Sequence, residues 1–175
     1  GLDPERDRIF LIALRHPGGE VEILEDDDEA ALIRALVAKL QAIDPDVIEN
    51  HNLHGFDLPF LARRARALGV PLALGRTGAP GLRQRPAARG AKLGGGGDDP
   101  MRRARYTVPG RELIDTLDAV LRHDFATREL PGHGVKAVAR HLGLAGPPRE
   151  QIPGARVYEV FHSDPARVRR YATAD

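Results

Sequence analysis

One carboxylate of the sequence, Asp57, lies between a predicted strand and a predicted helix, a position at which the functional sites of α/β proteins are often found. Asp57 follows a short apolar strand, which opens at Val47 and Ile48, and a brief loop. It heads a helix that continues through Pro59, so its side chain would lie at the rim of a sheet, where the sites of α/β proteins gather. The alternative is a structural N-cap, a common role for Asp at a helix start. Periodicity alone leaves both interpretations open.

A second candidate pair stands at the end of the sequence. Tyr171 and Asp175 are four residues apart, so in a helix their side chains lie on one face, one turn from each other. Val168 shares this face, which indicates that the face is buried. A buried carboxylate is costly unless it is paired or holds a metal ion. The alternative is a frayed terminus with Asp175 in water.

Three other polar residues have weaker claims to a functional role. Asp115 follows the predicted strand 112–114 and could line a cleft at the rim of the sheet together with Asp57. An N-cap of the next helix is the more typical role. His51 and His54 have the spacing of a metal-binding pair. A pair without a Cys or a third His nearby is more often structural, so zinc is not expected.

Apolar spacing and turn residues predict the elements that would position these side chains. An apolar run at 8–14, the turn at 17–19 and the alternation at 20–24 predict an antiparallel hairpin. Further strands are predicted at 47–48, 106–108 and 112–114. Helices are predicted between 29 and 44, at 58–68, 116–122, 135–142 and 155–161, and after the N-cap Asp164. This is a mixed α/β layout.

Length and composition exclude several classes of protein. The 175 residues, 42% of them hydrophobic and 29% charged, are enough for one globular domain with a core. The chain has no Cys, which excludes disulfides and Cys-based zinc sites. No apolar run approaches the ~20 residues of a membrane span, and no signal-peptide pattern opens the chain. We therefore expect a cytoplasmic location and no membrane partner.

The formal net charge of +1 is unevenly distributed. Residues 1–75 carry 8 basic and 14 acidic side chains, whereas residues 76–105 carry 8 basic and 2 acidic ones. The segment 75–105 is rich in Gly, Pro and Arg and lacks apolar periodicity, so it is predicted to be a mobile loop inserted into the fold. Its positive charge would attract a polyanion such as a nucleic acid. The alternative is a solubilising surface insertion.

The candidate residues resemble the motifs of a known family. Asn52, Phe56 and Asp57 resemble the second exonuclease motif of family B DNA polymerases, which reads N, a short spacer, F or Y, and D. Tyr171 and Asp175 resemble the third motif of that family, Y-x-x-x-D. No single one of these motifs is very specific for the family, but the order and spacing of the motifs together are.

Two further stretches match the family in the right order. Gly110-Arg111-x-x-x-Asp115 resembles the strand between the motifs, and the segment that begins with Gly134 and Val135 resembles the helix start that grips a single strand. The resemblance makes residues 1–175 similar to a partial 3′→5′ exonuclease domain. It implies an α/β fold of the ribonuclease H-like type, in which a mixed sheet is flanked by helices.

The resemblance implies a metal-dependent hydrolase of the DEDDy group. In that group four carboxylates hold two Mg²⁺ or Mn²⁺ ions ~4 Å apart, which activate a water and stabilise the leaving 3′ oxygen. By resemblance, Asp57 and Asp175 are two of these ligands, and Tyr171 orients the attacking water or helps to deprotonate it. The expected reaction is removal of nucleotides from DNA 3′ ends, as in proofreading.

The resemblance also implies a binding surface for the 3′ end of single-stranded DNA. Asn52 and Phe56 would contact the terminal nucleotides, Phe56 by packing or stacking on a base. Gly134 and Val135 would hold the strand, more weakly than in the many relatives that carry Ser in place of Gly134. A polymerase domain in the same chain is a further expected partner.

One motif of the family is absent from the sequence. The first motif is D-x-E on a strand, and Asp3-Pro4-Glu5 has these letters, but Pro4 interrupts it and no apolar strand residues precede it. We therefore expect that the chain starts just after this motif, that the first strand is missing, and that the chain alone is inactive while its full-length parent is active. Two alternatives stay open, a degenerate nucleic-acid-binding domain and a related DEDD exoribonuclease.

Overall fold

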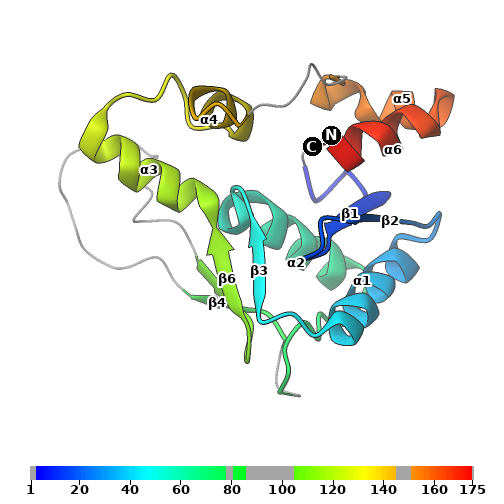
Figure 1. The fold of residues 1–175 in the computed structure, drawn as a ribbon. Coiled ribbons are helices and arrows are strands. Elements are labelled where there is room, and N and C mark those ends of the chain that lie inside the picture. The colour runs from blue at the N-terminus through cyan, green and yellow to red at the C-terminus, as the bar shows by residue number, and fades with distance from the viewer. Residues whose placement is uncertain (1–2, 78–80, 86–104, 145–150, 175) are drawn as a thin grey trace.

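The computed structural model describes residues 3–77, 81–85, 105–144 and 151–174, and Figure 1 shows the arrangement of their helices and strands. Within these ranges the strands form three two-stranded sheets. β1 (Leu11–Arg15) pairs antiparallel with β2 (Val21–Glu25), β3 (Val47–Asn50) pairs parallel with β6 (Glu112–Asp115), and β4 (Arg83–Arg85) pairs antiparallel with β5 (Arg105–Thr107). The predicted mixed α/β layout is confirmed, and its ribonuclease H-like type stays a prediction.

The hairpin of β1 and β2 is the predicted one, with a later start. Gly19 turns the chain with a φ of 89°, a backbone angle that suits glycine. Residues 8–10, which were expected in the first strand, lie outside it. The Ile9 N–H donates to Glu29 Oε1 at 2.8 Å instead of joining a ladder. A side chain thus takes the place of a strand partner there.

The helices lie where apolar spacing predicts them, although some of their ends differ. α1 spans Glu29–Ile43, and the Asp28 carboxylate caps it by accepting from the Ala30 N–H at 2.8 Å. Asp164 caps the last helix as predicted, by accepting from the Arg167 N–H at 3.0 Å. The others are α2 (Leu58–Ala67), α3 (Thr116–Thr127), α4 (Val135–His141), α5 (Val157–Ser163) and α6 (Pro165–Ala174).

Two helix boundaries differ from the prediction. α3 continues to Thr127, past the expected end near Arg122, and ends only where Arg128 takes a left-handed backbone with φ 57°. The helix expected from residue 155 begins with the 3₁₀ turn η3 (Gly154–Arg156) and becomes α-helical at Val157. Short 3₁₀ turns are common at helix starts, and sequence spacing does not distinguish them.

The connection between β3 and α2 is helical, so the predicted loop is wrong there. Asn52 has a left-handed backbone with φ 65°, and the π-helical turn η1 (Leu53–Asp57) follows it and runs directly into α2. Such turns are rare and are frequently found at functional sites. No periodicity in a five-residue stretch distinguishes them from a loop.

Part of the basic segment 75–105 is ordered into a strand, which corrects the prediction of a loop throughout. β4 pairs Gln84 with Tyr106 of β5. Just before β4, Gly81 lies so close to the preceding chain that a Cβ there would come within 1.9 Å of the Leu72 carbonyl oxygen. Only glycine fits this contact. Residues 78–80 and 86–104 of the segment lie outside the described residues.

Three small apolar clusters hold these elements together. Their buried members are Ile33 with Ala65 and Val70, Leu53 with Leu58 and Tyr106, and Ile152 with Val160 and Val168. The third cluster packs α5 and α6 against the start of β1. Figure 1 shows these two helices on the same side of the molecule as β1. The second cluster packs η1 and α2 against β5.

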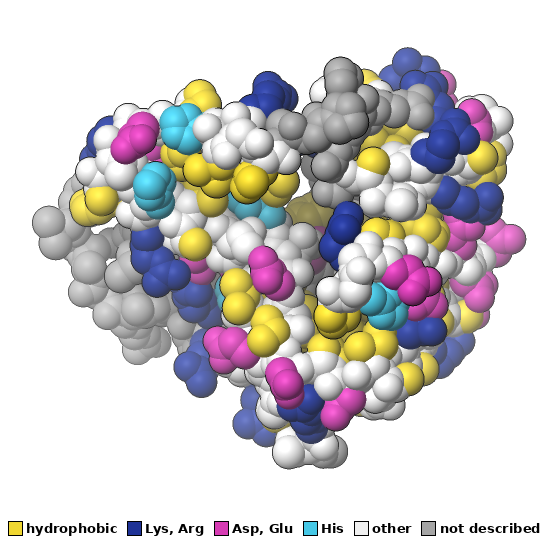
Figure 2. Space-filling model, viewed as in Figure 1, with side chains coloured by type: hydrophobic (Ala, Val, Ile, Leu, Met, Phe, Trp, Pro, Cys, Tyr) yellow, Lys and Arg dark blue, Asp and Glu magenta, His cyan; other side chains and the backbone are white. Residues whose placement is uncertain are grey.

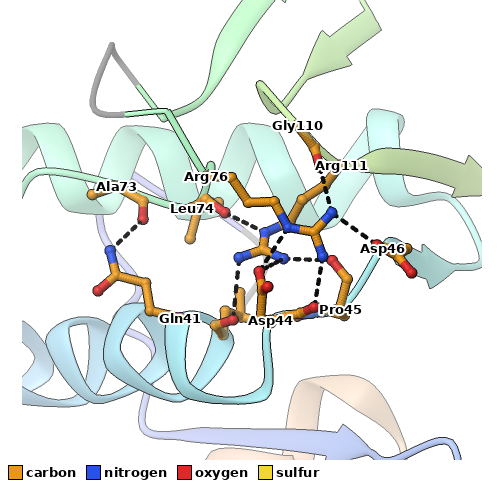
Figure 3. A network of polar contacts seen from close by, with 10 residues as sticks. Gln41, Asp44, Pro45, Asp46, Ala73, Leu74, Arg76, Gly110 and Arg111 are labelled. Atoms are coloured by element: carbon orange, nitrogen blue, oxygen red, sulfur yellow. Dashed lines mark hydrogen bonds and ion pairs between the residues drawn. The ribbon is translucent and has the colours of Figure 1, made fainter.

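A buried arginine ties together the ends of α1, β3 and β6 (Figure 3). The Arg111 side chain is only 1% exposed. Its Nη1 donates to Asp44 Oδ1 at 2.9 Å and to the Pro45 carbonyl, and its Nε donates to the Leu74 carbonyl at 2.8 Å. Arg76 binds the same Asp44 oxygen at 2.7 Å from the other side. This network fixes the ends of β3 and β6 at which the chain enters them.

No helix in the described ranges combines the length and the apolar character that crossing a bilayer would need.

Candidate functional site

A pocket of about 470 Å³ lies where the chain leaves β3, the end opposite the Arg111 network. Figure 1 shows the arrowheads of β3 and β6 directed towards the side of the molecule on which α4 lies. One wall is the end of β3 with η1, and the other is the start of α4. The lining residues are Asn50, His51, Asn52, Phe56, Asp57, Gly134, Val135, Lys136 and Ala137.

Asp115, at the end of β6, fixes the wall formed by η1. Its carboxylate accepts from the backbone N–H groups of Asn52 at 2.8 Å and His54 at 2.9 Å, and from that of Leu117 at 3.1 Å. The last of these bonds caps α3, so the predicted N-cap role is confirmed. The first two hold the turn beside the pocket. Asp115 therefore positions the cleft but does not line it.

The N-cap interpretation of Asp57 is wrong, because its side chain makes no capping hydrogen bond to α2. The carboxyl group is partly buried in the pocket instead. Burial, with a smaller contribution from the negative charge of Asp115, raises the pKa of Asp57 to about 6. Hydrogen bonds from the Asp57 backbone and the Asn50 side chain act in the opposite direction. An acid held this way is typical of a functional site.

The structure brings the four predicted substrate-binding residues to the same pocket as Asp57. Asn52 and Phe56 come from the η1 wall, and Gly134 and Val135 come from the α4 wall. The Phe56 ring is 38% exposed and Val135 is 47% exposed, so both present apolar surface to solvent. A Cβ at Gly134 would meet nothing within 4 Å, so a Ser side chain would fit there. Their roles stay predictions.

Tyr171 lies on α6 and packs against the cluster of Ile152, Val160 and Val168, so the predicted buried face is confirmed. It touches the pocket wall through Lys136, whose Nζ lies 3.5 Å from the Tyr171 hydroxyl oxygen. Asp175 lies outside the described residues, and its expected convergence with Asp57 stays a prediction. Figure 2 shows the face hollowed between the α4 region and the α5 and α6 region.

The two histidines of the β3–α2 connection have structural partners, as the sequence suggested. His51 places its Nδ1 3.1 Å from Thr116 Oγ1 and its Nε2 2.9 Å from the His133 carbonyl oxygen. His54 is buried, and its Nδ1 accepts from the Tyr106 N–H at 3.2 Å. Burial lowers the pKa of His54, which favours the neutral ring that this acceptor role needs.

The described residues hold no cluster of three or more His, Asp and Glu side chains that could bind a metal ion. Asp3 and Glu5 lie in a turn, in which the Asp3 carboxylate accepts from the Glu5 N–H at 3.0 Å. The expectation that these two residues are not a strand motif is confirmed. Among the Asp and Glu residues that the structure describes, Asp57 is the one that lines the pocket.

Sequence reasoning gave no pocket role to four of the lining residues, which are Asn50, His51, Lys136 and Ala137. Lys136 is the third residue of the stretch that begins at Gly134, so the resemblance covered it without giving it a role. His51 was noticed for metal-like spacing, while its contacts reach residues 65 and 82 positions away in the sequence. No local pattern encodes such contacts.

Comparisons with known proteins identify a family that matches most of the chain. Residues 3–128 match a family described as the exonuclease domain of DNA polymerase family B. The match includes β3 and η1, which form one wall of the pocket, and β6, whose Asp115 holds that wall.

Individual relatives are DNA polymerases much longer than this chain. The chain is 36% identical over 145 residues to DNA polymerase 2 of Aeropyrum pernix, which covers 81% of this chain and 15% of the relative. It is 28% identical over 157 residues to a DNA polymerase of Pyrococcus glycovorans, covering 89% of this chain and 17% of the relative. A solved family B DNA polymerase from Pyrobaculum calidifontis superposes on 98% of this chain and 20% of its own, with a TM-score of 0.71 and 28% identity.

Proposed function

The chain belongs to the exonuclease domain family of family B DNA polymerases, and on this basis we propose that it removes nucleotides from DNA 3′ ends as part of a longer polymerase. The reaction would be metal-dependent hydrolysis of the terminal phosphodiester bond. The observation that carries the proposal is the pocket, which joins Asp57 with Asn52 and Phe56 on one wall and with Gly134 and Val135 on the other.

The chemistry of Asp57 fits a ligand of Mg²⁺ or Mn²⁺. Hard divalent ions prefer oxygen donors, and a partly buried carboxyl whose pKa is raised by desolvation gains most from a cation beside it. Asp175 would be a second ligand. Two bound ions would activate a water and stabilise the leaving 3′ oxygen. Asp115 does not fit a ligand, because its oxygens already accept three backbone hydrogen bonds.

The other pocket residues would bind and orient the DNA strand. The exposed face of Phe56 offers a surface on which a terminal base can stack. Asn52 would bind the terminal nucleotide, and the open backbone at Gly134 would let the strand pass close to α4. The hydroxyl group of Tyr171 would orient the attacking water at the α6 side of the pocket.

Two wider features belong to the same proposal. The likeness to the Pyrobaculum calidifontis polymerase supports a ribonuclease H-like arrangement of the elements. The small share of each relative that the chain covers supports a polymerase domain in the same polypeptide. We further propose that these 175 residues alone do not hydrolyse DNA, because Asp57 is the one carboxylate that lines the pocket among the residues that the structure describes.

The same observation favours a second candidate function. A domain whose pocket is lined by one carboxylate would bind single-stranded DNA without hydrolysing it. This is the alternative of a degenerate nucleic-acid-binding domain. Intact carboxylates elsewhere in the full-length protein would exclude it.

A nuclease assay on 5′-labelled single-stranded DNA tests the proposal, with the 175-residue chain and the full-length protein assayed side by side in Mg²⁺, in Mn²⁺ and in EDTA. We expect stepwise shortening from the 3′ end by the full-length protein in either metal, and none in EDTA or by the chain alone. A full-length protein that binds the strand but leaves it intact would establish the degenerate alternative. A matched RNA oligonucleotide, if shortened faster, would establish a ribonuclease.

A further inference from the structure

The two walls of the pocket come from segments that are far apart in the sequence, and apolar packing does not explain what keeps them together. None of the seven residues of α4 is buried. Ala137, Val138 and Ala139 are only partly buried. A helix with so little buried surface owes its position mainly to polar contacts, since burial of apolar surface is the usual source of helix stability in proteins.

His51 makes such a contact from the opposite wall. Its Nε2 lies 2.9 Å from the carbonyl oxygen of His133, the residue directly before Gly134. A carbonyl oxygen can only accept, so Nε2 must carry the proton. Nδ1 lies 3.1 Å from Thr116 Oγ1, within hydrogen-bond distance of the hydroxyl group. Both ring nitrogens are used, which fixes the orientation of the ring and places the α4 start at a set distance from β3.

A second set of contacts fixes the segment between α3 and α4 from its other side. The His133 ring places Nε2 2.7 Å from Asp124 Oδ2. The other oxygen of Asp124 accepts from the Leu130 N–H at 3.0 Å. The backbone carbonyl of His133 contacts His51, and the His133 side chain contacts Asp124 of α3. His133 is therefore fixed on two sides.

We propose that His51 is a positioning residue, which holds α4 against the pocket and so sets the distance between the Gly134–Val135 wall and the wall of Asn52 and Phe56. This inference rests on the proposed function in one respect, that the gap between the walls receives the DNA strand. Without the bond to His133, α4 moves away from η1 and the strand loses its second wall.

Two variants of His51 separate the hydrogen bond from the shape of the ring. His51→Phe keeps an aromatic ring and loses both hydrogen bonds. His51→Gln keeps an N–H near the place of Nε2, so it should restore the bond to His133. His123→Phe, at an exposed position on α3, is the matched control.

The position of α4 can be measured directly because the chain has no Cys of its own. Spin labels on Arg66→Cys in α2 and Arg140→Cys in α4, both exposed positions, report the distance between the two helices. We expect one narrow distance distribution for the unmodified His51, for His51→Gln and for His123→Phe, and a broad or displaced one for His51→Phe. An unchanged distribution in His51→Phe overturns the proposal.

The affinity for a labelled oligothymidylate, measured on the same 175-residue variants in EDTA, tests the link to the strand. We expect His51→Phe to weaken binding by about three- to tenfold, the size expected for one lost hydrogen bond, with His51→Gln close to the unmodified chain. A displaced α4 with unchanged affinity overturns the proposal. If the unmodified chain binds no oligonucleotide, the proposed function fails, and the distance measurement still decides the role of His51.

Discussion

The ammonium nitrogen of Lys136 lies 5.2 Å from the centre of the Tyr171 ring and 3.5 Å from the hydroxyl oxygen of that residue. The contact joins the α4 wall of the pocket to α6, which carries Tyr171 of the predicted third motif. It also holds a positive charge at the edge of a pocket that we expect to receive a phosphate chain. Lys136 is therefore placed to bind a phosphate of the strand.

Replacement of Lys136 by Ala should weaken binding of single-stranded DNA and reduce its dependence on salt. Loss of one phosphate contact should lower the slope of log K against log salt concentration by about 0.7. Fluorescence anisotropy at several salt concentrations measures this slope. Lys39→Ala is the control, because Lys39 pairs with Glu22 on the far elements α1 and β2, outside the pocket. Equal slopes for both variants would show that Lys136 binds no phosphate.

Replacement of Asp57 by Ala in the full-length protein should abolish most of the nuclease activity. A lost metal ligand removes several kcal/mol of transition-state stabilisation, which corresponds to a rate about a thousandfold lower or more. Single-turnover hydrolysis of labelled DNA measures the loss. Glu49→Ala, which removes an exposed acid of the neighbouring strand β3, is the matched control and should hydrolyse at a nearly unchanged rate.

Replacement of Tyr171 by Phe should have a smaller effect than Asp57→Ala. The ring keeps its packing against Val168 and its neighbours, and only the orientation of the water suffers, for which we expect a loss of about ten- to a hundredfold. The same single-turnover assay compares the two variants. Losses of equal size would contradict the separate roles assigned to the acid and the phenol.

Replacement of Asp57 by Asn should stabilise the metal-free fold at neutral pH. Below pH 3.8 the acid is protonated in the folded and the unfolded chain alike. Between pH 3.8 and about 6 the unfolded chain releases its proton while the folded chain keeps it, so the free energy of unfolding falls as pH rises. Above pH 6 the acid is ionised in both states and the full cost remains, about 1–2 kcal/mol once solvent screening of a partly exposed group is allowed for.

Urea unfolding in EDTA at pH 4, 5, 6 and 8 checks this sign. The stability difference between Asp57→Asn and the unmodified chain should grow from pH 4 to 6 and then stay constant. Asp27→Asn, which removes one exposed carboxylate from the turn before α1, serves as the control. A difference that shrinks as pH rises would mean that the pKa of Asp57 is not raised.

Replacement of Arg111 by Ala should destabilise the fold strongly. It would leave the Pro45 and Leu74 carbonyls without their donor and leave Asp44 with Arg76 alone, for which we expect a loss of about 3 kcal/mol or more in the free energy of unfolding. Arg34→Ala is the control, because Arg34 forms only an exposed pair with Asp28, worth under about 1 kcal/mol. Similar losses in both variants would show that the network contributes little.

The parts of the fold that the sequence predicts are those set by local rules. The hairpin follows from its Gly turn and alternation, α1 follows from its apolar spacing, and α6 follows from its Asp164 cap. Asp57 was singled out as a rim carboxylate for the same reason, since it lies where a strand passes into a helix. Its neighbours in the pocket, Gly134 and Val135, came from the family resemblance alone.

The parts that could not be predicted depend on contacts between distant residues. Glu29, the first residue of α1, is buried, accepts from the Ile9 N–H and pairs with Arg64 of α2 at 2.8 Å. β4 has three arginine- and glutamine-type residues and no apolar pattern, and it becomes a strand only because β5 lies beside it. Tertiary partners override local preference in both cases.

The Arg111 network and the pocket occupy opposite ends of the same two strands. Local opening costs least where few groups are buried, and none of the residues of α4 is buried. We therefore expect α4 to open locally while the Arg111 network stays folded. Substitutions confined to the start of α4 should then alter binding in the pocket with little change in the temperature of unfolding, because the Arg111 network lies at the other end of β3 and β6.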